Sequence, residues 1–260
     1  MSSFDRIGTI GTLGDYEWTR RTGGRLQRRE RRGMVIDLAR VHAGNLVGRL
    51  GMLARVNPGK HAYVSPERLL PPDSALTRRA LDAATRVLPG TLLNHSRRTY
   101  VFGRALAEVD GLDVDAELLC AAALLHDVGL TLPRGREDFT LVSARVARDV
   151  AEQVGLSTAG TDTLLTAITM HHSPRVPLEA GPVAHLLAAG AGVDVVGLRS
   201  WDLPRTILEN AVGAHPREGF KASFTALWAD EAARVPQGRA MLLRRYGAFT
   251  AAIAIAPFDE

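Results

Sequence analysis

Hydrophobic residues recur every three or four positions along most of the chain, and this spacing predicts a series of amphipathic helices. In the segment 34–56, for example, apolar residues follow one another at steps of 4, 4, 3, 4 and 3 from Val35 to Leu53. Glycine and proline separate the later segments. We expect helices at about 34–56, 76–87, 91–109, 115–128, 138–154, 162–172, 182–199, 203–214 and 217–235, followed by a mixed apolar tail at 237–254. No useful stretch alternates between apolar and polar residues, so the sequence predicts an all-α fold.

The helical pattern also divides the chain into three regions. Residues 1–75 predict a basic N-terminal extension and connector, whose first 33 residues are rich in Gly, Thr and Arg and look poorly packed. Residues 76–200 carry a continuous helical pattern and predict the main helical domain. Residues 201–260 predict a C-terminal helical extension packed on that domain.

The composition is that of an ordinary globular protein, with 46% hydrophobic and 23% charged residues. The single cysteine, Cys120, lies in an apolar run and is expected to be a buried thiol. The sequence contains no apolar run long enough to span a membrane and no secretory signal. We therefore expect a cytoplasmic protein.

Charge is distributed unevenly, although the formal net charge is only +4. Residues 1–60 contain 12 basic and 5 acidic residues, which gives them +7 and leaves −3 for the remainder. The arginine-rich arm at residues 20–32 could contact nucleic acid or an acidic membrane surface. Only Tyr16 and Trp18 lie close enough in sequence to stack on bases, so we do not expect nucleic-acid binding. The arm could also act as a lid or as a contact in a homo-oligomer.

Four polar residues interrupt apolar helix faces and form the candidate site. His95 has apolar residues at −3, +7 and +11, His126 at −3 and −7, and Asp194 at −7 and −11. Each side chain should therefore face the core. Asp127 points about 100° away from His126 on an ideal helix. The two can converge only near a helix end, which Gly129 is expected to provide.

A buried carboxylate without compensation is costly, by several kcal/mol. A shared divalent cation would remove that cost. Two imidazoles and two carboxylates form a mixed nitrogen and oxygen set that suits Zn, Fe, Mn, Co or Ni. We therefore predict one divalent metal ion held by His95, His126, Asp127 and Asp194.

The order His…His-Asp…Asp on apolar helices resembles the HD superfamily of metal-dependent hydrolases. The resemblance covers about residues 75–200, and four segments carry it: Asn94–Tyr100 (NHSRRTY), Leu124–Gly129 (LLHDVG), Ala167–His171 (AITMH) and Gly192–Gly197 (GVDVVG). Within the superfamily, these segments look most like cyanamide hydratase and its relatives. The resemblance implies an HD-domain helical bundle and the same four metal ligands.

The resemblance also places His171 at the position of a further active-site histidine, which could bind substrate, move a proton or ligate a second metal. HD enzymes with two metals usually carry additional histidines before this point, and none occurs between Asp127 and His171. We therefore expect one metal, with Asp127 and His171 as the catalytic residues. His172 is expected beside His171 on the helix surface, and His171, His172 and Arg98 are the candidate substrate contacts. We expect a structural role for His185.

Such a site implies that water activated by the metal reacts with a small-molecule substrate. Phosphoester hydrolysis is the commonest activity in the superfamily and is the first interpretation. The sequence has no Gly-rich phosphate loop, and the candidate phosphate contacts are Arg97, Arg98, Arg145 and Arg175. The closer local resemblance favours hydration of a small nitrile-like or amide-like molecule. A third hypothesis is a metal-containing regulatory or binding protein without turnover.

Overall fold

The computed structural model describes residues 11–132 and 135–260. Within these ranges the chain forms twelve α-helices, five short 3₁₀ helices and no strands, which confirms the all-α prediction. The α-helices are α1 (Tyr16–Thr22), α2 (Arg28–Leu53), α3 (Ala75–Val87), α4 (Gly90–Asp110), α5 (Ala116–Leu125), α6 (Phe139–Gln153), α7 (Thr158–Met170), α8 (Pro182–Val196), α9 (Arg205–Ala214), α10 (Phe220–Arg234), α11 (Arg239–Tyr246) and α12 (Phe249–Ala254). The 3₁₀ helices are η1 (Pro58–Lys60), η2 (Pro66–Leu69), η3 (Val128–Leu130), η4 (Leu178–Ala180) and η5 (Ser200–Asp202).

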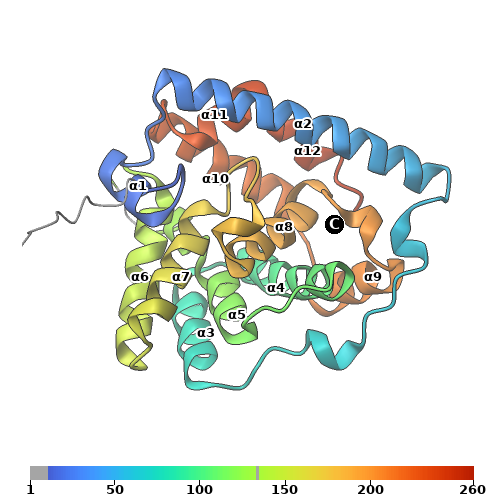
Figure 1. Ribbon diagram of the computed structural model, residues 1–260, viewed down its shortest axis with the longest axis horizontal. Coiled ribbons are helices and arrows are strands. Elements are labelled where there is room, and N and C mark those ends of the chain that lie inside the picture. Colours follow the sequence, from blue (N-terminus) through green and yellow to red (C-terminus); the bar gives the residue numbers. More distant parts are fainter. Residues whose placement is uncertain (1–10, 133–134) are drawn as a thin grey trace, which may run out of the picture.

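Helices α3 to α8 form the body of the molecule, and the long helix α2 runs across it beside the C-terminal helices (Figure 1). Helix α2 packs on α11, while α10 contacts α4 and α12 contacts α8. The C-terminal helices therefore lie between α2 and the body. None of the described helices is long and apolar enough to cross a membrane.

Helices α4 and α8 cross closely at the centre of the body because each presents a glycine to the other. A Cβ atom added to Gly190 would lie 2.3 Å from the carbonyl oxygen of Thr99, and one added to Gly103 would lie 2.9 Å from the carbonyl oxygen of Leu186. Neither glycine leaves room for a side chain. This close crossing brings His95 on α4 and Asp194 on α8 together in the interior, where both are fully buried.

The start of the chain is better packed than the sequence predicts. Residues 1–10 lie outside the described part, but from residue 11 the chain is folded onto the body. Asp15 caps α1 by accepting a hydrogen bond from the backbone N–H of Trp18 at 2.8 Å. The Trp18 side chain is 2% exposed and donates a hydrogen bond to Glu30 at 2.8 Å. The expectation of poor packing is therefore wrong for α1 and the residues beside it, whereas most side chains at 27–33 are exposed.

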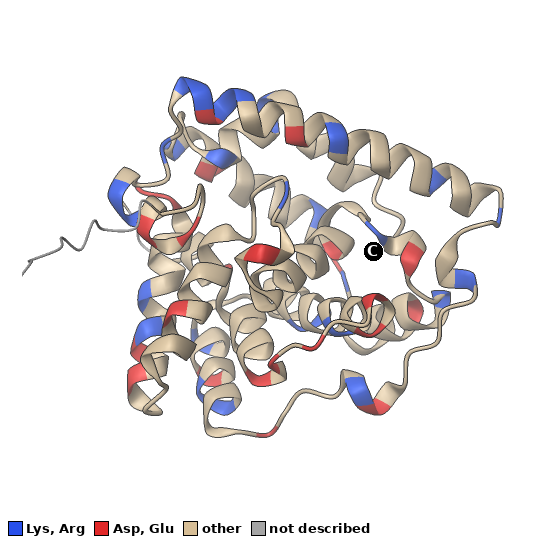
Figure 2. Cartoon of the chain, in the orientation of Figure 1, with Lys and Arg blue, Asp and Glu red and all other residues tan. Residues whose placement is uncertain are grey.

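Helix α2 also begins six residues before the predicted start, at Arg28. The side chain of Glu30 accepts a hydrogen bond from the backbone N–H of Gln27 at 2.7 Å, which fixes the first turn. The arginine-rich run at residues 28–32 consequently forms the beginning of α2, and its basic residues are visible there in Figure 2. The apolar spacing did not predict a helix over this run, because its residues are mostly charged and the apolar spacing begins only after it.

Other helix boundaries differ by a few residues. Helix α7 begins at Thr158 rather than 162, because Ser157 caps it by accepting a hydrogen bond from the backbone N–H of Gly160 at 3.1 Å. The tail at 237–254 divides into α11 and α12. The predicted connector at 57–75 contains η1 and η2. Cys120 is a buried free thiol, as predicted.

Candidate metal centre

Three histidines and one aspartate converge inside the helical body. The Nε2 atoms of His95 and His126 lie 3.2 Å apart. One carboxylate oxygen of Asp127, Oδ2, lies 3.4 Å from Nε2 of His95 and 3.3 Å from Nε2 of His126. The other, Oδ1, lies 3.5 Å from Nε2 of His171. The three imidazoles therefore direct the same ring nitrogen toward one carboxylate.

Each imidazole is held in this orientation through its other nitrogen, Nδ1. Nδ1 of His126 lies 2.7 Å from the carbonyl oxygen of Ala123, and Nδ1 of His171 lies 2.7 Å from the carbonyl oxygen of Ile168. Because a carbonyl oxygen only accepts hydrogen bonds, both Nδ1 atoms donate and carry the proton. The Nε2 lone pairs of the neutral rings then remain available to a metal ion or a proton.

The backbone brings His126 and Asp127 to one point because helix α5 ends immediately before them. The last helical residue is Leu125, and Asp127 has φ −106° and ψ 3°, outside the helical range. Gly129, expected to end the helix, instead lies in η3, where an added Cβ would lie 2.0 Å from the carbonyl oxygen of Phe139. The convergence predicted for a helix end is present, but Gly129 serves close packing against α6.

Burial and neighbouring charges shift the pKa values of Asp127 and His95 in opposite directions. Burial would raise the pKa of Asp127, but the surrounding histidines, His126 first, hold it well below its ordinary value. Burial lowers the pKa of His126. Burial would also lower the pKa of His95, but Asp127 and Asp194 outweigh it and raise the pKa. The aspartate is therefore ionised, and the site contains a buried negative charge.

The donor atoms fit a divalent cation. Ligand atoms of His95, His126 and Asp127 all lie within 4.8 Å of one another, and the three residues are buried. Within the described ranges, neither carboxylate oxygen of Asp127 has a hydrogen-bond partner. A buried ionised carboxylate without a partner is strongly unfavourable. A cation bound between these residues would remove that penalty, and two imidazoles with a carboxylate are ligands that zinc and related metals accept.

Comparison with protein families agrees with this geometry. Residues 92–191 match the family model of the HD domain. The matched segment contains His95, His126, Asp127 and His171 and ends just before Asp194. The match supports the HD superfamily of metal-dependent hydrolases for this part of the chain. Among curated proteins, none matches the chain significantly.

Asp194 has a different setting from the other three predicted ligands. Its Oδ2 atom lies 2.7 Å from Nδ1 of His95, on the ring nitrogen that does not face Asp127. Arg98 donates two hydrogen bonds to the Asp194 carboxylate, at 2.7 and 2.9 Å, and Arg217 donates another. Burial would raise the pKa of Asp194, but His95 and Arg98 hold it below its ordinary value. The contact from Asp194 fixes the ring orientation of His95.

Arg98, expected to contact substrate, is fully buried behind the centre. Its remaining donor, Nη1, reaches the carbonyl oxygens of His215 and Pro216 at 2.7 and 3.1 Å. Arg98 is absent from the described wall of the adjoining cavity. Arg217 was missed by sequence analysis. It lies 23 residues after Asp194, beyond the HD match, and no local pattern links the two.

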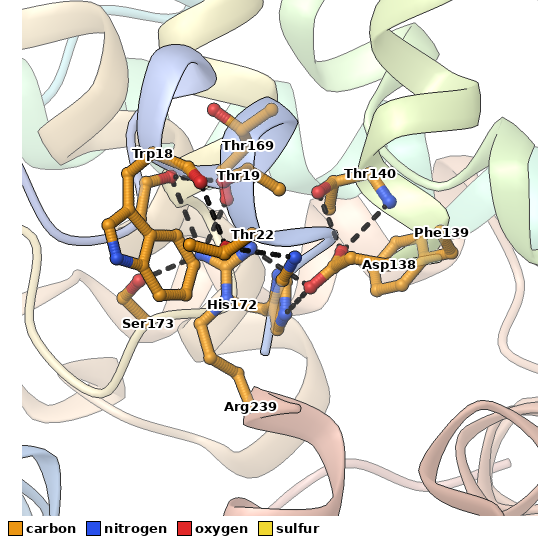
Figure 3. A network of polar contacts seen from close by, with 12 residues as sticks. Trp18, Thr19, Thr22, Asp138, Phe139, Thr140, Thr169, His172, Ser173 and Arg239 are labelled. Carbon is orange, nitrogen blue, oxygen red and sulfur yellow. Dashed lines mark hydrogen bonds and ion pairs between the residues drawn. The ribbon is translucent and has the colours of Figure 1, made fainter. Parts of the chain in front are cut away.

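His172 is buried and lines the cavity next to His171, so the expectation of a surface position is wrong. Its Nε2 atom lies 3.4 Å from Asp138, which also accepts a hydrogen bond from Arg239 at 3.0 Å. Figure 3 shows these three residues close together, with Trp18 beside Arg239. Burial lowers the pKa of His172 to about 4. Asp138 and Arg239 could not be predicted as part of the site, because a charged residue in a sequence is ordinarily exposed.

The centre opens into a cavity of about 340 Å³, whose wall includes His95, His126, Asp127 and His171. His185 also lines it, with Nδ1 2.8 Å from the carbonyl oxygen of Val176. The cavity gives a small molecule access to the convergent histidines and to Asp127.

Proposed function

We infer that the chain is a metal-dependent hydrolase that uses an activated water molecule on a small-molecule substrate. The observation that carries this proposal is the buried Asp127 carboxylate, whose oxygens accept no hydrogen bond from a described residue and lie 3.3–3.5 Å from three imidazole Nε2 atoms at the end of a cavity. A divalent cation bound there would lower the pKa of water and stabilise negative charge that develops on the substrate. The HD-domain match supports the same activity class.

The residues of the centre take distinct roles in this proposal. His95, His126 and Asp127 would hold the cation through the Nε2 and carboxylate atoms described above. We assign Asp194, predicted from sequence as the fourth ligand, to the orientation of His95, because Arg98, Arg217 and His95 already engage its oxygens.

Proton movement is assigned to Asp127 and His171. Asp127 Oδ1 faces His171 and can accept a hydrogen bond from the attacking water. His171 lines the cavity with its Nδ1 atom held by the backbone, so its Nε2 lone pair can accept a proton from the attacking water and then donate that proton to the product or leaving group.

Two substrate types fit this chemistry. Phosphoester hydrolysis is the commonest activity of the superfamily and remains the first candidate. Hydration of a small nitrile or amide is the second, and the setting of Arg98 favours it. The hydrogen bonds from Arg98 go to Asp194 and to two carbonyl oxygens, which leaves that guanidinium unable to bind a phosphate.

The proposal predicts that His126→Ala and Asp127→Ala each remove bound metal and turnover together, with activity falling at least a hundredfold. Metal content would be measured by elemental analysis. Turnover would be measured on a panel of nucleotides and phosphoesters, run beside cyanamide and simple nitriles. Asp149→Ala, at an exposed aspartate on α6, is the control and should keep both properties.

Full activity in a metal-free Asp127→Ala protein would refute the proposal. Stoichiometric metal without turnover on any substrate would instead favour the metal-containing binding or regulatory protein.

A further inference from the structure

The cavity beside the metal centre extends well beyond the reacting groups. Its volume of about 340 Å³ lies within the range of small-molecule binding sites, roughly 300–1,000 Å³. One water molecule occupies about 30 Å³ of liquid. The space is therefore sufficient for a molecule of about ten non-hydrogen atoms, which is far larger than the two or three atoms that can react at Asp127.

One wall of this space is made by small side chains on α8. Ala188, Ala189, Ala191 and Gly192 all line the cavity, followed by Val195. Because none of the first four extends beyond a Cβ atom, this stretch of α8 leaves a gap between itself and the facing helices. A larger residue at any of these positions would fill part of the cavity.

The facing walls are apolar as well. Helix α10 contributes Phe224 and Trp228, helix α12 contributes Phe249, and α2 covers the space with Leu38 and Val41. These side chains offer dispersion contacts and the exclusion of water, and they offer few hydrogen bonds to a ligand. The polar groups His42, Asn45 and Ser173 also line the cavity, but a polar or charged ligand body lying against the apolar side chains would lose its hydration without replacement.

Apart from its histidines, the described cavity wall has basic side chains only at Arg175 and Arg199. Arg199 donates hydrogen bonds to Asp110 and to Asp202, all at 2.8 Å, so its charge is already balanced. Arg175 is exposed. Beyond the metal ion of the proposed function, a phosphate group inside the cavity would therefore find no cluster of buried arginine or lysine side chains to balance its charge.

We propose that the substrate is an uncharged molecule with an apolar body, which fills the cavity beneath α2 while its polar reacting group lies against Asp127 and His171. A nitrile or an amide carrying an alkyl or aromatic group has this form. The inference rests on the proposed hydrolase function and specifies its substrate class.

The cavity supplies its own binding signal, because Trp201 and Trp228 line it. Intrinsic fluorescence of the full-length, metal-loaded protein would be titrated with straight-chain nitriles from acetonitrile to heptanenitrile. Alkyl phosphates of matching chain length would serve as charged comparators. Each buried methylene should lower Kd by about fourfold until the cavity is full. The matching phosphates should bind at least tenfold more weakly than the nitriles.

A variant that fills the cavity gives a second test. Ala188→Leu should weaken binding of the longer nitriles at least tenfold while leaving metal content unchanged. The same substitution at exposed Ala159, on α7, is the control and should change neither property. If Ala188→Leu does not fold, as judged by circular dichroism, the chain-length series on the unmodified protein decides the matter.

A Kd that does not depend on chain length, or equal binding of nitriles and alkyl phosphates, would overturn the inference. Chain-length dependence without bound metal or turnover would refute the proposed hydrolase and leave the apolar cavity assignment in place. Hydrolysis of phosphoesters without chain-length dependence would support the proposed hydrolase and refute the apolar cavity assignment.

Discussion

At the scale of single residues, a group of buried charges lies on the side of His95 that faces away from Asp127. Asp194 is fully buried and receives hydrogen bonds from Arg98 and Arg217 as well as contacting His95. Removing one partner of such a group leaves a charge without compensation in a dry environment, which costs more than the pair itself contributes. Arg98 should therefore act on folding and on the orientation of His95.

We expect Arg98→Met to reduce the free energy of unfolding by about 3–5 kcal/mol. The loss arises because the hydrogen bond from Arg217 to one oxygen of Asp194 replaces only part of the bidentate contact. Chemical denaturation would measure the change. Arg97→Met, at the partly exposed neighbouring arginine, is the control and should change stability by less than about 0.5 kcal/mol. A stable Arg98→Met protein with a raised KM would show that Arg98 contacts substrate instead, as the sequence predicts.

At the scale of elements, the crossing of α4 and α8 determines whether His95 and Asp194 meet. The two helices approach through Gly103 and Gly190, and neither position has space for a side chain. A methyl group on Gly190 would overlap the carbonyl oxygen of Thr99 on α4, so the helices would have to separate.

Gly190→Ala should lower the free energy of unfolding by about 1–3 kcal/mol and reduce metal affinity. Thermal unfolding and metal titration would measure the two effects. Gly213→Ala on α9 is a matched control, because an added Cβ there meets nothing within 4 Å. That substitution should stabilise the protein by up to about 1 kcal/mol, since alanine favours helix. Equal effects of the two substitutions would contradict the close crossing.

The same elements show what the sequence can and cannot predict. Apolar spacing located most helices of the body, and the convergence of His126 and Asp127 at a helix end followed from local geometry. The contact of Asp194 with Arg217 could not be predicted in this way, because Arg217 is distant in sequence and lies in the connection between α9 and α10. The setting of His172 also depends on tertiary contacts with Asp138, which no periodicity reveals.

At the scale of the whole molecule, the N-terminal extension is part of the folded body. Trp18 is buried between α1 and the body, and its indole N–H reaches Glu30 on α2. Arg239 on α11 lies over the Trp18 ring at 5.6 Å. The extension therefore connects the first helices to the C-terminal helices and holds α2 over the cavity.

Trp18→Ala should lower the free energy of unfolding by about 3–5 kcal/mol, since it leaves a large void and removes one of the two hydrogen bonds that the Glu30 carboxylate accepts. Denaturant unfolding would measure the loss. Tyr63→Ala, at an aromatic residue that is 83% exposed, should leave stability nearly unchanged. Unchanged stability in Trp18→Ala would mean that the extension is not docked on the body.

The way in which the imidazoles are held has a consequence for how the site can diversify. The groups that fix Nδ1 of His95, His126 and His171 are Asp194 and the carbonyl oxygens of Ala123 and Ile168. None of these three residues belongs to the described cavity wall. Mutations that reshape the wall therefore leave the histidine tautomers as they are. A lineage of such proteins can acquire new specificities on α8 and α10 while its inherited chemistry stays the same.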